Sequence, residues 1–449
     1  MTSTTTAFPF PPPRVKRTRW AEVVLLGCGG LLVCCWWQIR ALGDVREHLG
    51  RFYGWFAAAF VIYLAALAIV RRAEQARTSS WRALAWVAVI AAACRLIMVG
   101  ATPTLSDDVY RYRWDGRVQL AGLDPYAAAP DDPSLQRLRD DDFAHINFPH
   151  LRTVYPPLAE LAFRCGASLG RTVMSQKLVF VAAELMLALS LWSLLWRRGR
   201  SPLWIAAYAW HPLAMLEIAG SGHNDSLGMA WLWAGLAAWE ARSRLGAAVA
   251  WAAAFLSKFL SLALVPWWWF RRAGDGRRWL GLFLGLALLP IALHAHELTA
   301  LAGSLWAMTT RHSSNASLYL LLAEGCGHAR WTPLAAFGIA GAWMAWWARR
   351  VADPVRYLFG ALMAAALLSP ALHPWYVVWL VPFTCFWRVP AMMALTGTAV
   401  LAYTVWPGYL AGGPWKIPAW AHVAEYAPVF LLGLWELQRR HNLMCSMGV

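Results

Sequence analysis

The stretch Trp81–Tyr126, WRALAWVAVIAAACRLIMVGATPTLSDDVYRYRWDGRVQLAGLDPY, changes character at Gly100. Up to that glycine it is almost wholly apolar and long enough to form a helix that crosses a membrane. Beyond it come Asp107 and Asp108, then arginines, tyrosines and a tryptophan in close succession. A membrane helix followed at once by such a segment predicts a polar, aromatic site beside the lipid.

The rest of the chain repeats the apolar half of this pattern. Of 449 residues, 59% are hydrophobic and only 14% are charged, and there are 31 tryptophans. A soluble protein of this length could not bury so much apolar surface. The composition therefore predicts an all-α polytopic membrane protein.

Apolar runs and basic clusters together predict about 11–13 transmembrane helices. The expected spans are Trp20–Ile39, Phe52–Val70, Trp81–Gly100, Val173–Trp196, Pro202–Gly220, Ser226–Trp239, Gly246–Phe270, Trp279–His296, Trp331–Ala348, Val355–Leu372, Trp375–Trp387, Met392–Tyr409 and Ala419–Leu437. Clusters such as Arg71–Arg72 and Arg349–Arg350 mark the cytoplasmic side. Both termini are then cytoplasmic, and the polar segment 101–172 lies outside.

The expected organisation is one transmembrane domain, residues 20–440. Residues 1–19 are expected to form a disordered cytoplasmic tail, and residues 441–449 a second tail. The run Gly246–Phe270 lies between two basic clusters, so we expect a hairpin of two short helices with Lys258 at its tip. Trp375–Trp387 is short, and we expect it to be re-entrant or tilted.

The net charge of +16 does not indicate nucleic-acid binding, because the basic residues lie mostly in short clusters between spans. Most of the eight cysteines lie inside apolar runs and none form a Cys-x-x-Cys pair, so neither disulfides nor a zinc site is expected. No P-loop or Gly-x-Gly-x-x-Gly motif follows a strand pattern. We expect no cofactor; a divalent metal held by His223 and Asp107 or Asp108 has no spacing signature behind it.

Asp107 and Asp108 have two interpretations. Aspartates just beyond a helix end can cap the helix that follows. Alternatively, one of them is a general base that takes a proton from a sugar hydroxyl while a cation neutralises a leaving phosphate. Asp115, further along the same helix, orients substrate hydroxyls or pairs with Arg111.

Two basic residues fall within expected spans, where an ionisable group is a functional candidate. Arg95 either serves function or extends its side chain to the interface. Lys258 has no acid nearby in sequence, so it either meets a lipid phosphate or reaches the interface at the hairpin tip.

Two external motifs remain, His223-Asn224-Asp225 and His373-Pro374-Trp375-Tyr376. The first either caps the next helix or hydrogen-bonds a sugar or phosphate. Trp375 and Tyr376 are either interface anchors or carbohydrate-stacking residues. We expect substrate contacts from side chains of these two motifs and of the external segment 101–172: Tyr110, Arg111, Asp115, Tyr126, Tyr155, Asn224, His373 and Tyr376.

Taken together, SDDVYRYRWDGRVQLAGLDPY, TVYPPLAELAF, GHNDSLGMAW, SKFLSLALVP and HPWYVVWLVP resemble the GT-C class of integral-membrane glycosyltransferases. The greatest similarity is to bacterial α-mannosyltransferases that use polyprenyl-phosphate mannose. The resemblance runs from about Arg95 to Tyr376, and its first-loop motif is the most specific part.

The resemblance implies a GT-C-like helical bundle whose first long external loop is catalytic and carries short amphipathic helices. It implies inverting transfer of a sugar, with mannose expected, from a polyprenyl-phosphate donor to a glycolipid or polysaccharide acceptor on the external face of the plasma or inner membrane. Asp108 or Asp107 would be the base, with Asp108 preferred. Candidates for holding the donor phosphate are Lys258, Arg95, His223 and Arg311.

Two other functions fit the same composition. A lipid or sugar transporter would carry polar residues within the membrane in both halves, whereas here the acids gather on one external loop. A polymerase or ligase that uses a finished lipid-linked glycan would share the external site and differ in the length of its donor.

Overall fold

The computed structural model describes residues 19–76, 80–270, 276–293, 299, 301–307 and 314–446. Over these residues the chain is helical, and its one extended contact is an isolated bridge between Ser314 and Ala371. The prediction of an all-α polytopic membrane protein is confirmed.

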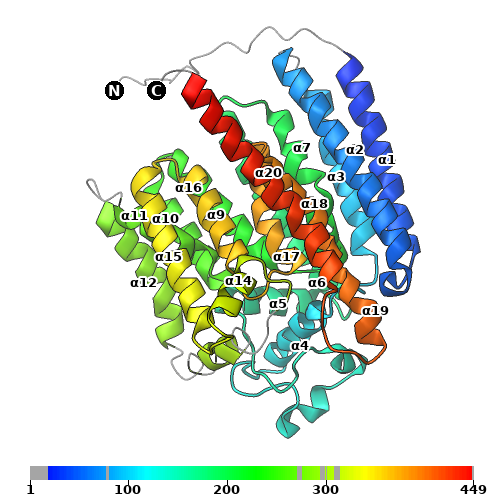
Figure 1. The fold of residues 1–449 in the computed structure, drawn as a ribbon. Coiled ribbons are helices and arrows are strands. Elements are labelled where there is room, and N and C mark those ends of the chain that lie inside the picture. The colour runs from blue at the N-terminus through cyan, green and yellow to red at the C-terminus, as the bar shows by residue number, and fades with distance from the viewer. Residues whose placement is uncertain are drawn as a thin grey trace, which may run out of the picture.

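Helices of a dozen residues or more form most of the bundle (Figure 1). They are α1 (Arg19–Ala41), α2 (Leu49–Gln75), α3 (Trp81–Val99), α4 (Asp108–Leu120), α5 (Pro157–Leu169), α6 (Val173–Arg197), α9 (Asp225–Glu240), α10 (Arg244–Lys258), α12 (Gly276–Leu293), α15 (Thr332–Arg350), α16 (Pro354–Leu367) and α20 (Ala419–Ser446).

Shorter helices connect them. They are α7 (Ala206–Ala209), α8 (Pro212–Ala214), α11 (Val265–Phe270), α14 (Leu318–Gly325), α17 (Pro374–Val377), α18 (Pro390–Thr398) and α19 (Val405–Leu410). The 3₁₀ turns are η1 (Val45–His48), η2 (Pro133–Leu138), η3 (Asp141–His145), η4 (Pro202–Ile205), η6 (Leu260–Leu264), η7 (Val378–Cys385) and η8 (Ala399–Thr404), and η5 (Met215–Gly220) is a π-helix.

Within the described residues, four helical segments are long and apolar enough to cross a membrane: Trp20–Ala41, Val45–Gln75, Trp81–Val99 and Val173–Arg197. They coincide with the first four expected spans. The expected span Pro202–Gly220 is wrong as a single helix, because it divides into η4, α7, α8 and η5. Pro212 lacks the backbone N–H that would continue a helix through this point.

The predicted hairpin around Lys258 is present. α10 ends at Lys258, and Phe259 adopts the left-handed backbone conformation that terminates it (φ 57°). The chain then folds back, since the Ser261 hydroxyl donates to the carbonyl of Trp251 (2.7 Å) and the Trp268 ring lies 4.9 Å from the Trp251 ring.

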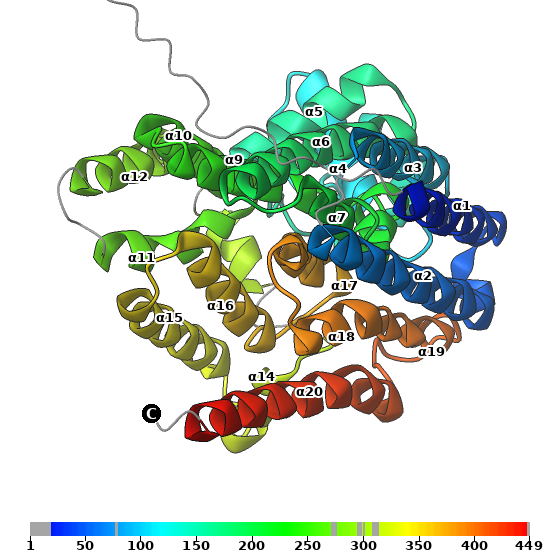
Figure 2. The same ribbon diagram turned by 90° about the horizontal axis from the view of Figure 1, so that it is seen from above.

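The start of α1 and the end of α20 lie at the same end of the bundle, whereas α4 and α5 lie at the other end (Figure 1). In the perpendicular view α1–α3 form one side, α10–α12 and α15 lie opposite, and α20 runs along an edge (Figure 2). α20 continues to Ser446, into the segment expected as a C-terminal tail, while residues 1–18 and 447–449 lie outside the described residues. Which end faces the cytoplasm stays a prediction.

The polar segment 101–172 is an ordered layer across one end of the bundle. Its helices α4 and α5 cross closely at Gly116, where any Cβ would lie 2.3 Å from the Phe163 carbonyl oxygen. Ion pairs join Arg113 to Asp142 and Arg117 to Asp140, so η3 and its flank are tied to α4. This layer fixes the start of α4 against the membrane helices.

Candidate active site

Four segments that are distant in sequence meet beside the start of α4. They are Asp107 and Asp108 at that start, the turn Ser221–Asn224 before α9, Lys258 at the end of α10, and the loop before α17. Each segment lies at a helix end, so polar side chains from the ends of several helices lie together. The motifs around Asp108, His223, Lys258 and His373 therefore gather in one site.

The carboxylate of Asp108 is partly exposed in this site. Its side chain is 27% exposed, and the amide of Asn147 donates to Oδ1 at 3.5 Å. The capping interpretation does not hold for either aspartate, because neither side chain bonds the first turn of α4 and the Ser106 hydroxyl accepts from the Asp108 N–H instead (3.3 Å). Both carboxylates remain available for chemistry.

Burial raises the pKa of Asp108 to about 6, although the nearby ammonium of Lys258 opposes the rise. Burial also raises the pKa of Asp107, against the opposing charges of Arg46 and His145. A carboxylate with a pKa near neutral pH is both ionised at pH 7 and basic enough to accept a proton usefully. Asp108 therefore remains the candidate general base of this site.

Lys258 has partners that the sequence did not reveal. Its ammonium donates to Asn224 Oδ1 (2.8 Å) and to Asp225 Oδ2 (3.2 Å), and Trp379 Nε1 donates to the other oxygen of Asp225 (2.6 Å). Asn224 and Asp225 thus bond Lys258 rather than capping α9. An ammonium has three donors, and these two bonds leave one for a substrate oxygen.

His223 is fully buried and lies flat against Trp375, with ring centroids 4.2 Å apart and planes at 19°. His373 covers the other face of the same indole at 4.3 Å and 6°. Both faces of Trp375 are therefore occupied by protein, which leaves no face for sugar stacking. The two nitrogens of His223 point at the carboxylates of Asp108 (3.7 Å) and Glu217 (3.5 Å), an arrangement unsuited to holding an anionic phosphate.

Arg95 lies apart from this cluster. Its guanidinium forms a buried ion pair with Glu184 (2.9 Å) and donates to the carbonyls of Ala91 and Ala209. The Tyr208 hydroxyl also bonds Glu184 (2.8 Å). Arg95 therefore joins α3, α6 and α7, and we do not carry it into the site as a phosphate ligand.

Several expected substrate-binding residues instead hold the polar layer together. Arg111 pairs with Asp115 (2.9 Å) and donates to the Leu151 carbonyl, as the alternative interpretation of Asp115 anticipated. The Tyr126 hydroxyl donates to the carbonyl of Tyr155 (2.6 Å). These contacts fix the shape of the layer below the site.

The other expected substrate contacts lie closer to the centre of the site. Tyr376 packs on His373 and Trp379, and the Lys258 ammonium lies 5.7 Å from its ring centroid. Tyr110, in the first turn of α4, stacks on His145 at 4.6 Å. Arg311, the remaining phosphate candidate, lies outside the described residues.

Sequence reasoning missed several buried ionisable residues. Glu217 and Glu184 are wholly or almost wholly buried, and Lys177 lies beneath the site with its ammonium on the carbonyls of Met98 and Ala101. Each falls within an expected span, where a charged side chain should by itself have indicated a specific role.

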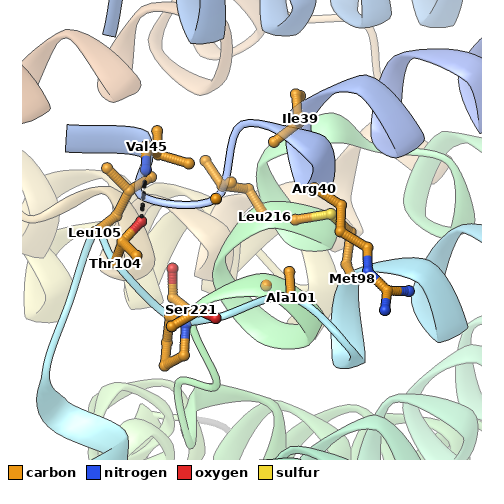
Figure 3. Close-up of a pocket in the computed structure, with 13 residues that line it drawn as sticks. Ile39, Arg40, Val45, Met98, Ala101, Thr104, Leu105, Leu216 and Ser221 are labelled. Carbon is orange, nitrogen blue, oxygen red and sulfur yellow. Dashed lines mark hydrogen bonds between the residues drawn. The ribbon is translucent and has the colours of Figure 1, made fainter. Parts of the chain in front are cut away.

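A small, mainly apolar pocket lies between η5, the ends of α1 and α3, and the segment before α4 (Figure 3). Ile39, Met98, Leu105 and Leu216 line it, and the Val45 N–H donates to the Thr104 hydroxyl at its edge (3.1 Å). Its lining contains none of the carboxylates of the site.

The sequence predicted neither a metal site nor disulfides, and the structure bears on this in the described part of the chain only. There, no group of three or more His, Cys, Asp or Glu side chains could hold a metal ion. The seven cysteines with described side chains are free thiols.

The comparisons with known proteins agree with this geometry. A model of the MptA_B family, alpha-(1->6)-mannopyranosyltransferase, N-terminal domain, matches residues 14–271, which is more than half of the chain. The match includes the start of α4, the turn before α9 and Lys258. Neither the curated proteins nor the solved structures give a match. The chain belongs to this mannosyltransferase family and is a membrane-embedded glycosyltransferase.

Proposed function

We propose that the protein transfers mannose from polyprenyl-phosphate mannose to a glycolipid or polysaccharide acceptor on the external face of the membrane, with Asp108 as general base. The observation that carries the proposal is that Asp108 and Lys258 lie in one polar site at the end of the bundle: Lys258 bonds Asn224, and the neighbouring His223 lies 3.7 Å from Asp108. The carboxylate of Asp108 can take a proton, and the ammonium of Lys258 can stabilise negative charge on a leaving group.

The proposed reaction needs only these two kinds of group. A hydroxyl oxygen of the acceptor attacks the anomeric carbon of the donor while Asp108 takes the hydroxyl proton. The bond from that carbon to the phosphate oxygen breaks, and its electron pair leaves with the phosphate. Attack opposite the leaving group inverts the anomeric carbon.

Lys258 supports the leaving group in this proposal. The third hydrogen of its ammonium is free to bond a phosphate oxygen, and a fixed cation stabilises the charge that develops there. Asp225 and Asn224 hold the ammonium in place but also neutralise part of its charge. The cation is therefore positioned for a phosphate without being left unpaired in the free enzyme.

The sugar and the linkage rest on the family, whose description as an alpha-(1->6)-mannopyranosyltransferase supports an α-(1→6) linkage to mannose. The lipid-linked donor rests on the resemblance of the sequence motifs. The site lies where α9 begins and α10 ends, and it closely follows the end of the membrane-spanning helix α3 in the chain, which suits a donor whose sugar phosphate is carried on a lipid. Tyr110 and Tyr376 are the proposed sugar contacts.

The test compares donors with the purified protein in lipid nanodiscs. Radiolabelled polyprenyl-phosphate mannose and GDP-mannose are supplied separately with a pool of bacterial glycolipids. We expect labelled glycolipid from the lipid-linked donor alone. Product from GDP-mannose alone would overturn the donor, and a finished lipid-linked glycan as the only donor would indicate a polymerase or ligase.

A second arm separates transfer from transport. Proteoliposomes that hold labelled polyprenyl-phosphate mannose are followed for movement of label and for covalent product. Movement of label without any covalent product would contradict the transferase and favour a transporter.

A further inference from the structure

A second carboxyl group, Glu217, lies directly behind the proposed base. It belongs to the π-helix η5, and its Oε2 lies 3.5 Å from Nε2 of His223, whose Nδ1 lies 3.7 Å from Oδ2 of Asp108. The Tyr403 hydroxyl bonds both carboxyl oxygens of Glu217, at 2.8 and 2.9 Å. Four polar side chains thus form one row, Asp108–His223–Glu217–Tyr403.

Only one end of this row reaches the exterior. Asp108 is 27% exposed, whereas His223 and Glu217 are fully buried and Tyr403 is nearly so. No arginine or lysine bonds Glu217 in the described part of the chain. A buried carboxylate with no cation is costly, so Glu217 is stable here as the protonated acid.

The fold holds the His223 ring in the row. One face of the ring stacks on Trp375, and the backbone N–H of His223 donates to the Glu217 carbonyl (3.0 Å), which keeps the two residues adjacent. Gly222 just before it has φ 78° and lies against Lys177 and Val109, where a Cβ would be 3.1 Å away. The turn therefore has little freedom to move the ring elsewhere.

Both nitrogens of His223 lack a hydrogen bond of ordinary length, although each lies nearest to a carboxyl oxygen. Contacts of 3.5–3.7 Å in a substrate-free site are the kind that shorten once a substrate is bound. π-Helical segments also recur at functional sites, because they place a side chain that a regular helix would turn away.

We propose that His223 and Glu217 are positioning residues for Asp108, an inference that rests on the proposed function. Protonated Glu217 donates to Nε2 of His223, which fixes the proton of the neutral imidazole on Nδ1. Nδ1–H then donates to Oδ2 of Asp108 and stabilises its carboxylate form. Oδ1 stays free to take the proton of the acceptor hydroxyl.

Other charged and titratable groups also face Asp108. They are Lys258 from α10, Asp225 from α9, the neighbouring Asp107, and the hydroxyls of Tyr112, Tyr155, Tyr376 and Tyr403. His373 faces His223 from beyond the indole. A replacement of His223 leaves these groups in place, so a change in the titration of Asp108 reports on the row itself.

The experiment uses two matched ring replacements, His223→Phe and His373→Phe, in the full-length protein. Each keeps an aromatic ring on one face of Trp375, but only the first removes a donor to Asp108. We expect His223→Phe to shift the acid limb of the kcat/KM–pH profile upward by about one unit, the size of one hydrogen bond to a charged group. His373→Phe should leave the position of that limb unchanged, and KM should change less than kcat in His223→Phe.

Glu217→Gln and Glu217→Leu extend the test along the row. Gln can still donate to Nε2 and should keep the limb within a few tenths of a unit of wild type, whereas Leu should shift it as His223→Phe does. Equal shifts from His223→Phe and His373→Phe, or no shift from either, would overturn the proposal.

A readout without catalysis separates this proposal from the proposed function. Infrared difference spectroscopy of the protein at pH 7 should show a protonated carboxyl band that Glu217→Gln removes and Tyr403→Phe shifts. Absence of that band would refute the positioning row even in an active enzyme. The band in a protein that transfers no sugar would leave the row intact and refute the proposed function alone.

Discussion

Replacing Asp108 by Asn should make the protein more stable while making it a poorer catalyst. The ordinary pKa of an aspartate is 3.8, and burial raises that of Asp108 to about 6. The folded protein therefore holds this proton more tightly than the unfolded chain does. It follows that stability falls as the pH rises from about 4 to about 6 and stays low above that range.

The magnitude follows from the size of the shift. Two pKa units correspond to about 3 kcal/mol at about 1.4 kcal/mol each. Because 27% of the side chain is exposed, solvent screening reduces the expected effect to about 2 kcal/mol. An amide has a similar shape and no charge, so Asp108→Asn should recover this free energy at pH 7.

The assay is thermal unfolding in detergent, followed by tryptophan fluorescence, at pH 4.5 and pH 7.5. Asp108→Asn should melt a few degrees above wild type at pH 7.5, and this difference in melting temperature should be smaller at pH 4.5. Asp107→Asn is the matched control and should gain less, because Arg46 and His145 favour its charged form. A variant that is no more stable than wild type at pH 7.5 would contradict the account of a buried, destabilised carboxylate.

Three further predictions concern the charges of the site and the bundle. Transfer by the wild-type protein should fall about tenfold between pH 7 and pH 5, since Asp108 must be ionised to act as base; a profile flat to pH 4.5 would argue against this. Lys258→Met should lower kcat by about 10²–10³-fold in the mannose-transfer assay, because the leaving phosphate loses its cation, and Lys258→Arg should recover part of the loss. Arg95→Met should destabilise the protein by about 3–5 kcal/mol, because it leaves Glu184 buried and unpaired. The double variant Arg95→Met with Glu184→Leu should restore stability. It should also keep the activity per folded molecule.

Much of the site could be predicted, because helix ends that lie on the same side of a membrane are brought together at one end of the bundle. Asp107, Asp108 and His223 were each chosen as a polar side chain at the edge of an apolar run, and Lys258 was chosen as a single charge within one. The structure brings them together. The turn at Lys258 was predicted from charge alone, and α10 ends there.

What could not be predicted were the pairings between spans. Asp225 lies 33 positions before Lys258, and 89 positions separate Arg95 from Glu184, so neither pair follows from local patterns. Glu217 was overlooked for another reason. It sits in what read as one continuous apolar span, and only the π-helix after Pro212 turns it toward His223.

The central claim is that Asp108, rather than its neighbour, is the base. The most direct measurement is single-turnover transfer of labelled mannose from polyprenyl-phosphate mannose by the wild type, Asp107→Asn and Asp108→Asn. We predict that Asp108→Asn slows the chemical step by about 10²–10⁴-fold and that Asp107→Asn slows it far less. Transfer at the wild-type rate by folded Asp108→Asn would contradict the claim.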